Sequence, residues 1–145
     1  MLKIFYKDVK FRLRKTKEIK NWIVQVIRSE EKEPGDLSFI FVNDKYIRKI
    51  NKEFLAHDYY TDVIAFDYGE GKIIKGEIYI GIETIRRNTK IYRSTLKNEI
   101  LRVMIHGVLH LIGYNDTNEI EKKEIRRKED EYIKKFSKGK NGFQI

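Results

Sequence analysis

Cysteine is absent from this 145-residue chain, so disulfides, thiolate metal ligands and cysteine nucleophiles are all excluded. Any metal site must therefore use nitrogen and oxygen ligands. Proline occurs once, and the sequence contains no long apolar run and no internal repeat. We therefore expect neither a membrane-spanning helix nor a linker that divides the chain.

The first residues also lack the uninterrupted apolar stretch of a secretory signal peptide, because Lys3 and Lys7 lie within them. Together with the absence of cysteine, this predicts a soluble cytoplasmic protein with no membrane partner.

Positive charge is in excess, since 31 Lys and Arg residues outnumber 22 Asp and Glu residues and leave a net charge of +9. Basic residues gather in segments 7–20, 86–93 and 122–140, which suits a polyanionic partner such as a nucleic acid. The alternative is that most of these charges solvate helix faces, because Glu and Lys alternate at helical spacing through 119–135.

The length and the 41% apolar content predict a single domain over residues 1–145, with 137–145 as a flexible tail. Hydrophobic periodicity predicts strands at 2–6, 37–42, 62–68 and 77–80, and helices at 16–31, 43–54, 82–92, 96–112 and 119–136. Asn43 is expected to cap the second helix, and Pro34-Gly35 to end the first. This order of elements predicts an α+β fold, with a mixed sheet of about four strands packed against about five helices.

Two histidines lie beside the apolar face of the helix predicted at 96–112. His106 and His110 are four residues apart, which brings their Cβ atoms to roughly 5–6 Å on a helix and lets both imidazoles reach one ion. An HxxxH pair on a half-buried helix is also a common structural feature, so the pair alone does not establish a metal site.

The residues after this pair supply a third candidate ligand. Gly113 is expected to end the helix and let the chain reverse, which would bring Asp116 back toward the histidines. Three protein ligands with an open fourth position are typical of catalytic zinc, here at the end of a central helix. The alternative role for Asp116 is to cap the next helix, with Glu119 completing a capping-box-like spacing.

A metalloprotease is a poor interpretation of the same spacing. Those enzymes carry a glutamate after the first histidine as general base, and this chain has Gly107 there. The methionines, Met1 and Met104, also leave no downstream Met-turn.

Several motifs along the chain resemble those of one family in the same order. Residues 106–114, His-Gly-Val-Leu-His-Leu-Ile-Gly-Tyr, are similar to its HGxLHLxGY signature, and Glu99 lies where that helix usually carries an acid. Residues 51–54 with Asp58, residues 61–66 and residues 76–78 resemble its segment before the central strand, its TDVLSF motif and its GDI motif. The family is YbeY, a family of bacterial metal-dependent endoribonucleases, and the resemblance covers most of the chain.

The resemblance implies a single-strand-specific endoribonuclease involved in small-subunit rRNA maturation and ribosome quality control. It further implies one zinc ion, with other divalent metals left open, held by His106, His110 and Asp116. The expected partners are RNA, in particular rRNA, and the ribosome or its proteins. We expect a monomer.

Two departures from the family pattern concern the site itself. Asn115-Asp116 stands where the family has Asp-His, and a carboxylate ligand lowers the net charge of the site and favours harder metals. Leu55 stands where the family has an arginine thought to serve catalysis. His57, two residues on, is therefore a candidate catalytic residue, although a lone loop histidine is often simply solvent-exposed.

Further candidates for RNA binding are basic and aromatic. Arg86, Arg87, Lys90 and Arg93 recur on the helix predicted at 82–92, where they would contact phosphates or form an ordinary solvated face. Aromatic residues divide in the same way between core packing and base stacking: Tyr59, Tyr60, Phe66, Tyr68 and Tyr79.

Two rival functions remain from the sequence. One is a ribosome-assembly factor that binds rRNA or a ribosomal protein, with a structural metal and feeble catalysis, which Leu55 favours. The other is hydrolysis of a small amide or ester, which would require a deep apolar pocket and binding that is insensitive to salt.

Overall fold

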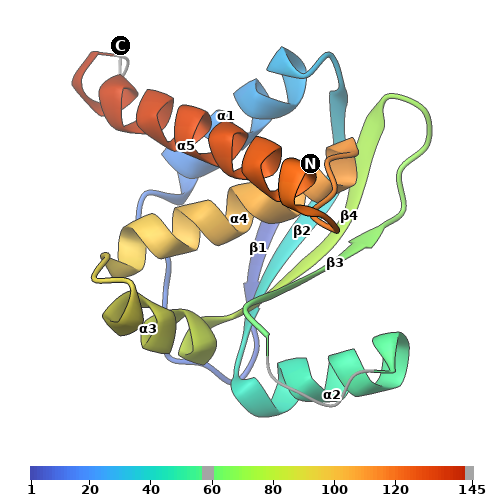
Figure 1. The fold of residues 1–145 in the computed structure, drawn as a ribbon, viewed down its shortest axis with the longest axis vertical. Coiled ribbons are helices and arrows are strands. Elements are labelled where there is room, and N and C mark those ends of the chain that lie inside the picture. The colour runs from blue at the N-terminus through green and yellow to red at the C-terminus, as the bar shows by residue number, and fades with distance from the viewer. Residues whose placement is uncertain (57–60, 143–145) are drawn as a thin grey trace.

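The computed structural model describes residues 1–56 and 61–142. Four strands and five helices follow one another within these residues (Figure 1). They are β1 (Leu2–Tyr6), α1 (Thr16–Ser29), β2 (Glu33–Val42), α2 (Asp44–Leu55), β3 (Val63–Asp67), β4 (Ile73–Gly81), α3 (Ile82–Ile91), α4 (Leu96–Ile112) and α5 (Glu119–Gly142).

The strands form one mixed sheet in the order β1-β2-β4-β3. β1, β2 and β4 are parallel, and β3 pairs antiparallel with β4 and occupies an edge. The predicted α+β fold with a four-stranded mixed sheet is therefore confirmed. Within the described residues, no helix is both long and apolar enough to cross a bilayer.

Helices α1 and α4 pack on one face of the sheet, and α5 packs on α4 (Figure 1). Buried side chains of the sheet and of these three helices form the main core. Side chains alternate along β2, so that Leu37, Phe39 and Phe41 are completely buried on this face. α2 covers the opposite face with a smaller cluster, formed by Val42, Ile47, Ile50 and Ile64. Both faces of the sheet are thus covered by helices.

Helix α4 runs close to the sheet because Gly107 carries no side chain. A Cβ atom at this position would lie 2.9 Å from Cγ2 of Ile78 on β4. The glycine therefore allows the helix to lie directly on the strand, and it fixes the height of the neighbouring His106 above the sheet.

The first predicted helix and the following strand differ from expectation. α1 ends at Ser29, so the prediction that Pro34-Gly35 ends the helix was wrong. Both residues lie inside β2, whose pairing with β4 shifts between Pro34 and Leu37. Such an irregularity tolerates proline because the missing N–H is not needed for the ladder.

The last helix also extends beyond its predicted end at residue 136, since α5 continues to Gly142. The flexibility expected for 137–145 stays a prediction, and residues 143–145 lie outside the described residues. The cap predicted at Asn43 is confirmed, because its Oδ1 accepts a hydrogen bond of 2.8 Å from the Tyr46 N–H.

Candidate metal centre

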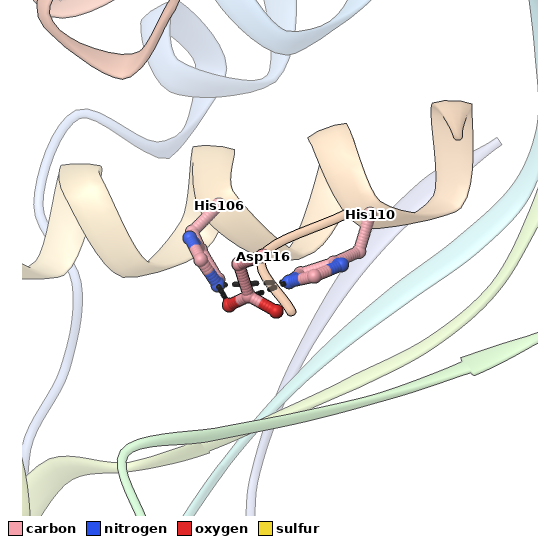
Figure 2. A group of neighbouring side chains, drawn as sticks. All are labelled: His106, His110 and Asp116. Atoms are coloured by element: carbon pink, nitrogen blue, oxygen red, sulfur yellow. Dashed lines mark hydrogen bonds and ion pairs between the residues drawn. The ribbon is translucent and has the colours of Figure 1, made fainter. Parts of the chain in front are cut away.

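Three side chains converge at the C-terminal end of α4 (Figure 2). The Nε2 atoms of His106 and His110 are 3.0 Å apart. Oδ2 of Asp116 lies 3.5 Å from Nε2 of His106 and 3.4 Å from Nε2 of His110. The three predicted ligands therefore direct two imidazole nitrogens and one carboxylate oxygen at the same point. Together they could hold a metal ion.

The spacing of these atoms fits a small tetrahedral ion. Zinc binds imidazole nitrogen and carboxylate oxygen at roughly 2.0–2.2 Å, which places neighbouring tetrahedral ligands about 3.4 Å from each other. The three observed separations, 3.0, 3.4 and 3.5 Å, scatter around that value. The donor set of two imidazoles and one carboxylate is also one that zinc uses in catalytic sites.

Local chain geometry explains why Asp116 reaches the histidines. Gly113 ends α4 with a φ of 128°, a positive value that favours glycine, and its N–H donates to the carbonyls of Leu109 and His110. The chain then turns back along the helix. The capping alternative for Asp116 is not what the structure contains, because Oδ1 of Asn118 accepts the Glu121 N–H at 2.8 Å and so caps α5.

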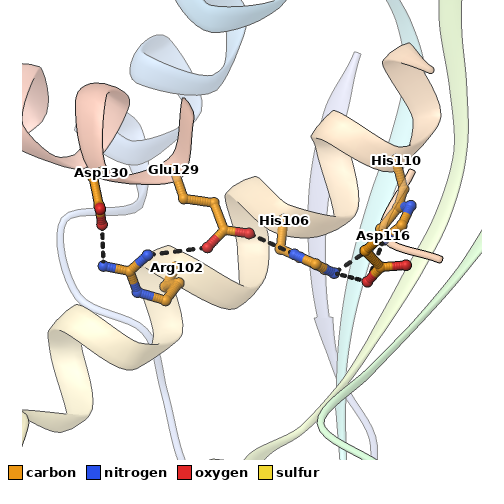
Figure 3. A network of polar contacts seen from close by, with 6 residues as sticks. All are labelled: Arg102, His106, His110, Asp116, Glu129 and Asp130. Carbon is orange, nitrogen blue, oxygen red and sulfur yellow. Dashed lines mark hydrogen bonds and ion pairs between the residues drawn. The ribbon is translucent and has the colours of Figure 1, made fainter. Parts of the chain in front are cut away.

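A chain of polar contacts supports His106 from behind (Figure 3). Its Nδ1 lies 2.5 Å from Oε2 of Glu129 on α5. Oε1 of Glu129 accepts a hydrogen bond of 3.0 Å from the guanidinium of Arg102 on α4. Arg102 also donates to Asp130 at 2.7 Å. A carboxylate on Nδ1 orients the imidazole and leaves Nε2 directed at the candidate metal position.

The sequence analysis missed Glu129. Its side chain is 5% exposed, in the same stripe of α5 as the buried Ile125 and Tyr132. The available signal was an acidic residue at a core position of a helix, since a carboxylate is almost never buried there without a partner.

The same contacts shift the protonation of His106. Burial alone would lower the pKa of this imidazole, but the hydrogen bond to Glu129 and the negative charges of Glu129, Asp116 and Asp62 raise it above its ordinary value. The carboxylates around the ring therefore stabilise positive charge at this position. They would stabilise a bound metal cation for the same reason.

The three candidate ligands open into a cavity of about 440 Å³ between α4, the end of α2 and β3. Asp62 lines this cavity and was not among the predicted site residues. Burial raises the pKa of its carboxyl group, and the charge of His106 and two backbone N–H groups offset that effect only in part. The signal in the sequence was a carboxylate directly before an apolar strand.

Leu55 also lines this cavity, at the position where the resemblance inferred from the sequence would place an arginine. His57 lies outside the described residues, so its predicted catalytic role stays a prediction. Across the described lining of the cavity there is no lysine or arginine.

The basic residues predicted to contact RNA lie elsewhere. Arg86, Arg87 and Lys90 are exposed on α3, and Arg93 follows it, whereas no described residue of α3 lines the cavity. Arg87 donates to Asp44 at 2.8 Å and so connects α3 to α2. The structure thus does not bring this group together with the candidate metal ligands, and its contact with RNA stays a prediction.

The described aromatic residues include both partly buried and exposed side chains. Phe66 and Tyr79 are half-buried beside the smaller core cluster, and Tyr68 is 53% exposed. Tyr59 and Tyr60 lie outside the described residues.

Comparison with known proteins identifies one family. A family model described as "Endoribonuclease YbeY" matches residues 3–137. The chain is 44% identical to the Endoribonuclease YbeY of Christiangramia forsetii, over 91% of this chain and 92% of that protein. It is 45% identical to the protein of the same name from Amoebophilus asiaticus, over 89% of this chain and 88% of that one.

A solved structure shares the fold as well. The solution structure of TM1509 from Thermotoga maritima superimposes with a TM-score of 0.67 at 26% identity, covering 100% of this chain and 96% of that one. The family model spans nearly the whole chain, and the relatives match over about nine tenths of their own length. The resemblance inferred from the sequence motifs is thereby confirmed, and the chain belongs to the YbeY family of endoribonucleases.

Proposed function

We propose that this protein is a metal-dependent endoribonuclease that cleaves single-stranded RNA, with one zinc ion held by His106, His110 and Asp116. One observation carries the proposal: in a chain of an endoribonuclease family, the three ligand atoms meet within 3.0–3.5 Å of one another at the wall of an open cavity. A site of three protein ligands leaves a position for substrate or water, as in catalytic zinc sites.

The biological role that fits this activity is maturation of small-subunit rRNA and ribosome quality control in the cytoplasm, by a monomer that meets the ribosome or its proteins. The motifs in 51–54, 61–66, 76–78 and 106–114 support it through their resemblance to the family. The net charge of +9 suits an RNA substrate.

Each of the side chains has a distinct task in this proposal. A divalent ion held by His106, His110 and Asp116 would supply Lewis acidity toward the phosphate and toward a water molecule. Glu129 holds the Nδ1 proton of His106, so that Nε2 remains a ligand. Asp116 contributes the anionic ligand and reduces the positive charge of the loaded site.

Hydrolysis requires an acceptor for the proton of the attacking water. The water oxygen bonds to phosphorus, the bond from phosphorus to the leaving ribose oxygen breaks, and that oxygen takes up a proton. Asp62 lines the cavity without belonging to the three ligands, and its raised pKa suits a group that takes and returns a proton. His57 and Asp116 are the other candidates from the sequence, and attack by the RNA 2′-hydroxyl is the alternative that would leave a cyclic phosphate.

A second candidate function is a ribosome-assembly factor with little or no catalysis. The cavity favours it in one respect, because Leu55 and the other described lining residues provide no lysine or arginine to stabilise the charge added to phosphate.

The test compares two variants in the loop between α4 and α5. Asp116→Ala removes a candidate ligand, and Asn118→Ala removes the cap of α5 while leaving all three ligands in place. Zinc content is measured by elemental analysis, and cleavage is followed on single-stranded and duplex RNA of the same sequence, with and without added zinc.

We expect wild-type protein and Asn118→Ala to bind about one equivalent of zinc and cleave the unpaired RNA, and Asp116→Ala to lose both properties. Zinc retained by Asp116→Ala would overturn the ligand assignment. Zinc bound by wild-type protein with all RNA left intact would favour the assembly-factor function.

A further inference from the structure

A second cavity, of about 320 Å³, lies on the opposite side of the sheet from the candidate metal centre. Its walls come from α2, from the end of β3 and from β4, and they are mainly aromatic. Phe54 and Tyr68 are 66% and 53% exposed, so flat apolar rings face solvent at its mouth. The proposed hydrolysis uses none of these residues.

The aromatic walls are held in place by one another. The ring of Phe66 makes edge contacts with Phe54 at 5.7 Å and with Tyr79 at 5.9 Å between ring centroids. Edge-to-face packing leaves the faces of some rings available. Exposed aromatic faces are the surfaces on which proteins stack the bases of single-stranded RNA.

A carboxylate lies among these rings. Oε1 of Glu77 accepts hydrogen bonds from the hydroxyls of Tyr68 at 3.2 Å and Tyr79 at 3.4 Å. Burial and the charge of Glu77 raise the pKa of Tyr79 to about 12, so this hydroxyl stays a donor. Among the residues that the structure describes, Oε2 of Glu77 has no hydrogen-bond or ion-pair partner.

We propose that this cavity binds a guanine base of single-stranded RNA, and this inference rests on the proposed function. Guanine presents two adjacent donors, N1–H and N2–H, which match the acceptors of the Glu77 carboxylate. Adenine and cytosine place an acceptor beside their donor, and uracil offers one donor between two carbonyls. The long bond from Tyr79 is easily exchanged, so its hydroxyl can donate to guanine O6 instead.

Charge at the rim does not select one base over another. Lys49 and Glu53 are both exposed on α2 at this rim, where they balance each other. Selectivity therefore comes from Glu77 and the rings inside, and attraction comes from the net charge of +9. A purely apolar peptide segment would leave the carboxylate and the phenol hydroxyls without new partners, which is costly.

The two cavities share the same elements. On β3, Val63 and Ala65 line the cavity of the metal centre, and Phe66 faces the aromatic cavity. At the end of α2, Leu55 lines the cavity of the metal centre and Phe54 lines the aromatic cavity. Because β3 is an edge strand, an RNA strand that crosses this edge can contact both cavities, and cleavage would then fall at a fixed offset from a guanine.

The experiment measures binding of fluorescein-labelled oligouridylates that carry one central guanosine, inosine, adenosine or uridine. Fluorescence anisotropy is recorded with protein kept free of metal by EDTA, so that the oligonucleotides stay intact, and cleavage of the same oligonucleotides by zinc-loaded protein is followed separately on gels. Inosine lacks the guanine N2 amino group and keeps N1–H and O6. The comparison therefore isolates the contact of the N2 amino group without any change in the protein. We expect the guanosine oligomer to bind roughly tenfold more tightly than the inosine oligomer.

Two variants extend the test. Glu77→Gln should abolish the guanosine preference, because an amide offers one acceptor in place of two, and Tyr68→Leu should weaken binding of every oligomer about tenfold through lost stacking. Matched controls are Glu70→Gln, an exposed carboxylate in the same hairpin, and Tyr92→Leu, an exposed tyrosine after α3. Both controls should bind as wild type does.

Equal affinity for guanosine and inosine oligomers would overturn the proposal, as would a preference that survives Glu77→Gln. Unchanged binding in Tyr68→Leu would overturn it in favour of a protein partner on these rings. RNA cleavage without any base preference would refute the guanine site alone. A guanosine preference without cleavage would support the site and contradict the proposed nuclease activity.

Discussion

Glu129 on α5 contacts two side chains of α4. Its two carboxylate oxygens connect Nδ1 of His106 to Arg102, and all three side chains are largely buried. The carboxylate therefore orients a candidate ligand on α4 from a different helix, α5.

We predict that Glu129→Ala lowers zinc affinity about 10–100-fold, the usual loss when the partner of a ligating histidine is removed. It also leaves the guanidinium of Arg102 without its buried partner, so the free energy of unfolding should fall by about 3 kcal/mol. Zinc titration and urea unfolding measure the two effects separately.

Asp130→Ala serves as the control, because Asp130 binds the same arginine from an exposed position and does not contact His106. Its zinc affinity should equal that of the wild type. Glu129→Gln should recover part of the affinity, since its amide oxygen still accepts from Nδ1. Equal zinc affinities in Glu129→Ala and Asp130→Ala would mean that Glu129 does not orient the ligand.

At the scale of elements, the contact between α4 and β4 depends on Gly107. We predict that Gly107→Ala destabilises the protein by about 1–2 kcal/mol, because a Cβ atom 2.9 Å from Cγ2 of Ile78 forces the helix or the strand to move. The higher helix propensity of alanine offsets about 1 kcal/mol of a larger strain. Thermal or urea unfolding measures the change.

A double-mutant cycle shows whether Ile78 is the cause. In an Ile78→Ala background the added methyl group has room, so Gly107→Ala should cost little or become stabilising. The same cost in both backgrounds would contradict this origin.

Glu30, which follows α1, contacts the loop after α4 and helix α5. Its carboxylate accepts from the hydroxyl of Tyr114 at 2.8 Å and from that of Tyr132, and lies 3.3 Å from Nζ of Lys128. Burial by itself raises the pKa of Glu30, but the hydrogen bonds from Tyr132, Tyr114 and Lys128 outweigh it and lower the pKa below 4.5. The ionised carboxylate thus stabilises the packing of α1 against α4 and α5.

We predict that Glu30→Gln lowers the free energy of unfolding by about 1 kcal/mol at neutral pH. Because the folded pKa lies below the ordinary value of 4.5, the contribution of the ionised group is complete above 4.5 and is lost as the pH falls through the folded pKa. The difference between wild type and Glu30→Gln should therefore shrink in acid, as measured by urea unfolding across this range. A difference that is independent of pH would contradict the prediction.

At the scale of the whole molecule, the net charge of +9 governs binding of any RNA. Affinity for single-stranded RNA should fall as salt rises, with a logarithmic slope of about 0.7 for each phosphate neutralised. We predict that the double variant Arg86→Ala and Lys90→Ala reduces this slope by about 1.4, if both exposed side chains of α3 contact phosphate.

The matched control is Lys122→Ala with Lys123→Ala, which removes the same charge from α5. A slope that falls equally in both double variants would indicate a general effect of net charge. An unchanged slope in the α3 variant would identify α3 as an ordinary solvated face.

Much of the fold followed from local patterns. The periodicity of 96–112 predicted α4 with its bounds, and the cap at Asn43 and the end at Gly113 followed from short-range chemistry. Pro34 was misjudged because a proline ends a helix in isolation but is tolerated at an irregular point of β2. That irregularity depends on β4, which is distant in the sequence.

The sequence by itself determined the two histidines and the aspartate as candidate ligands, because all three lie within eleven residues and one helix with one glycine turn brings them together. Tertiary structure decided the rest of the cavity. Asp62 and Leu55 reach it through the sheet and α2, and Glu129 reaches His106 from a later helix. Spacing along a chain reports contacts within one element, whereas contacts between elements depend on how the buried faces pack, and that packing is settled only when the whole core forms.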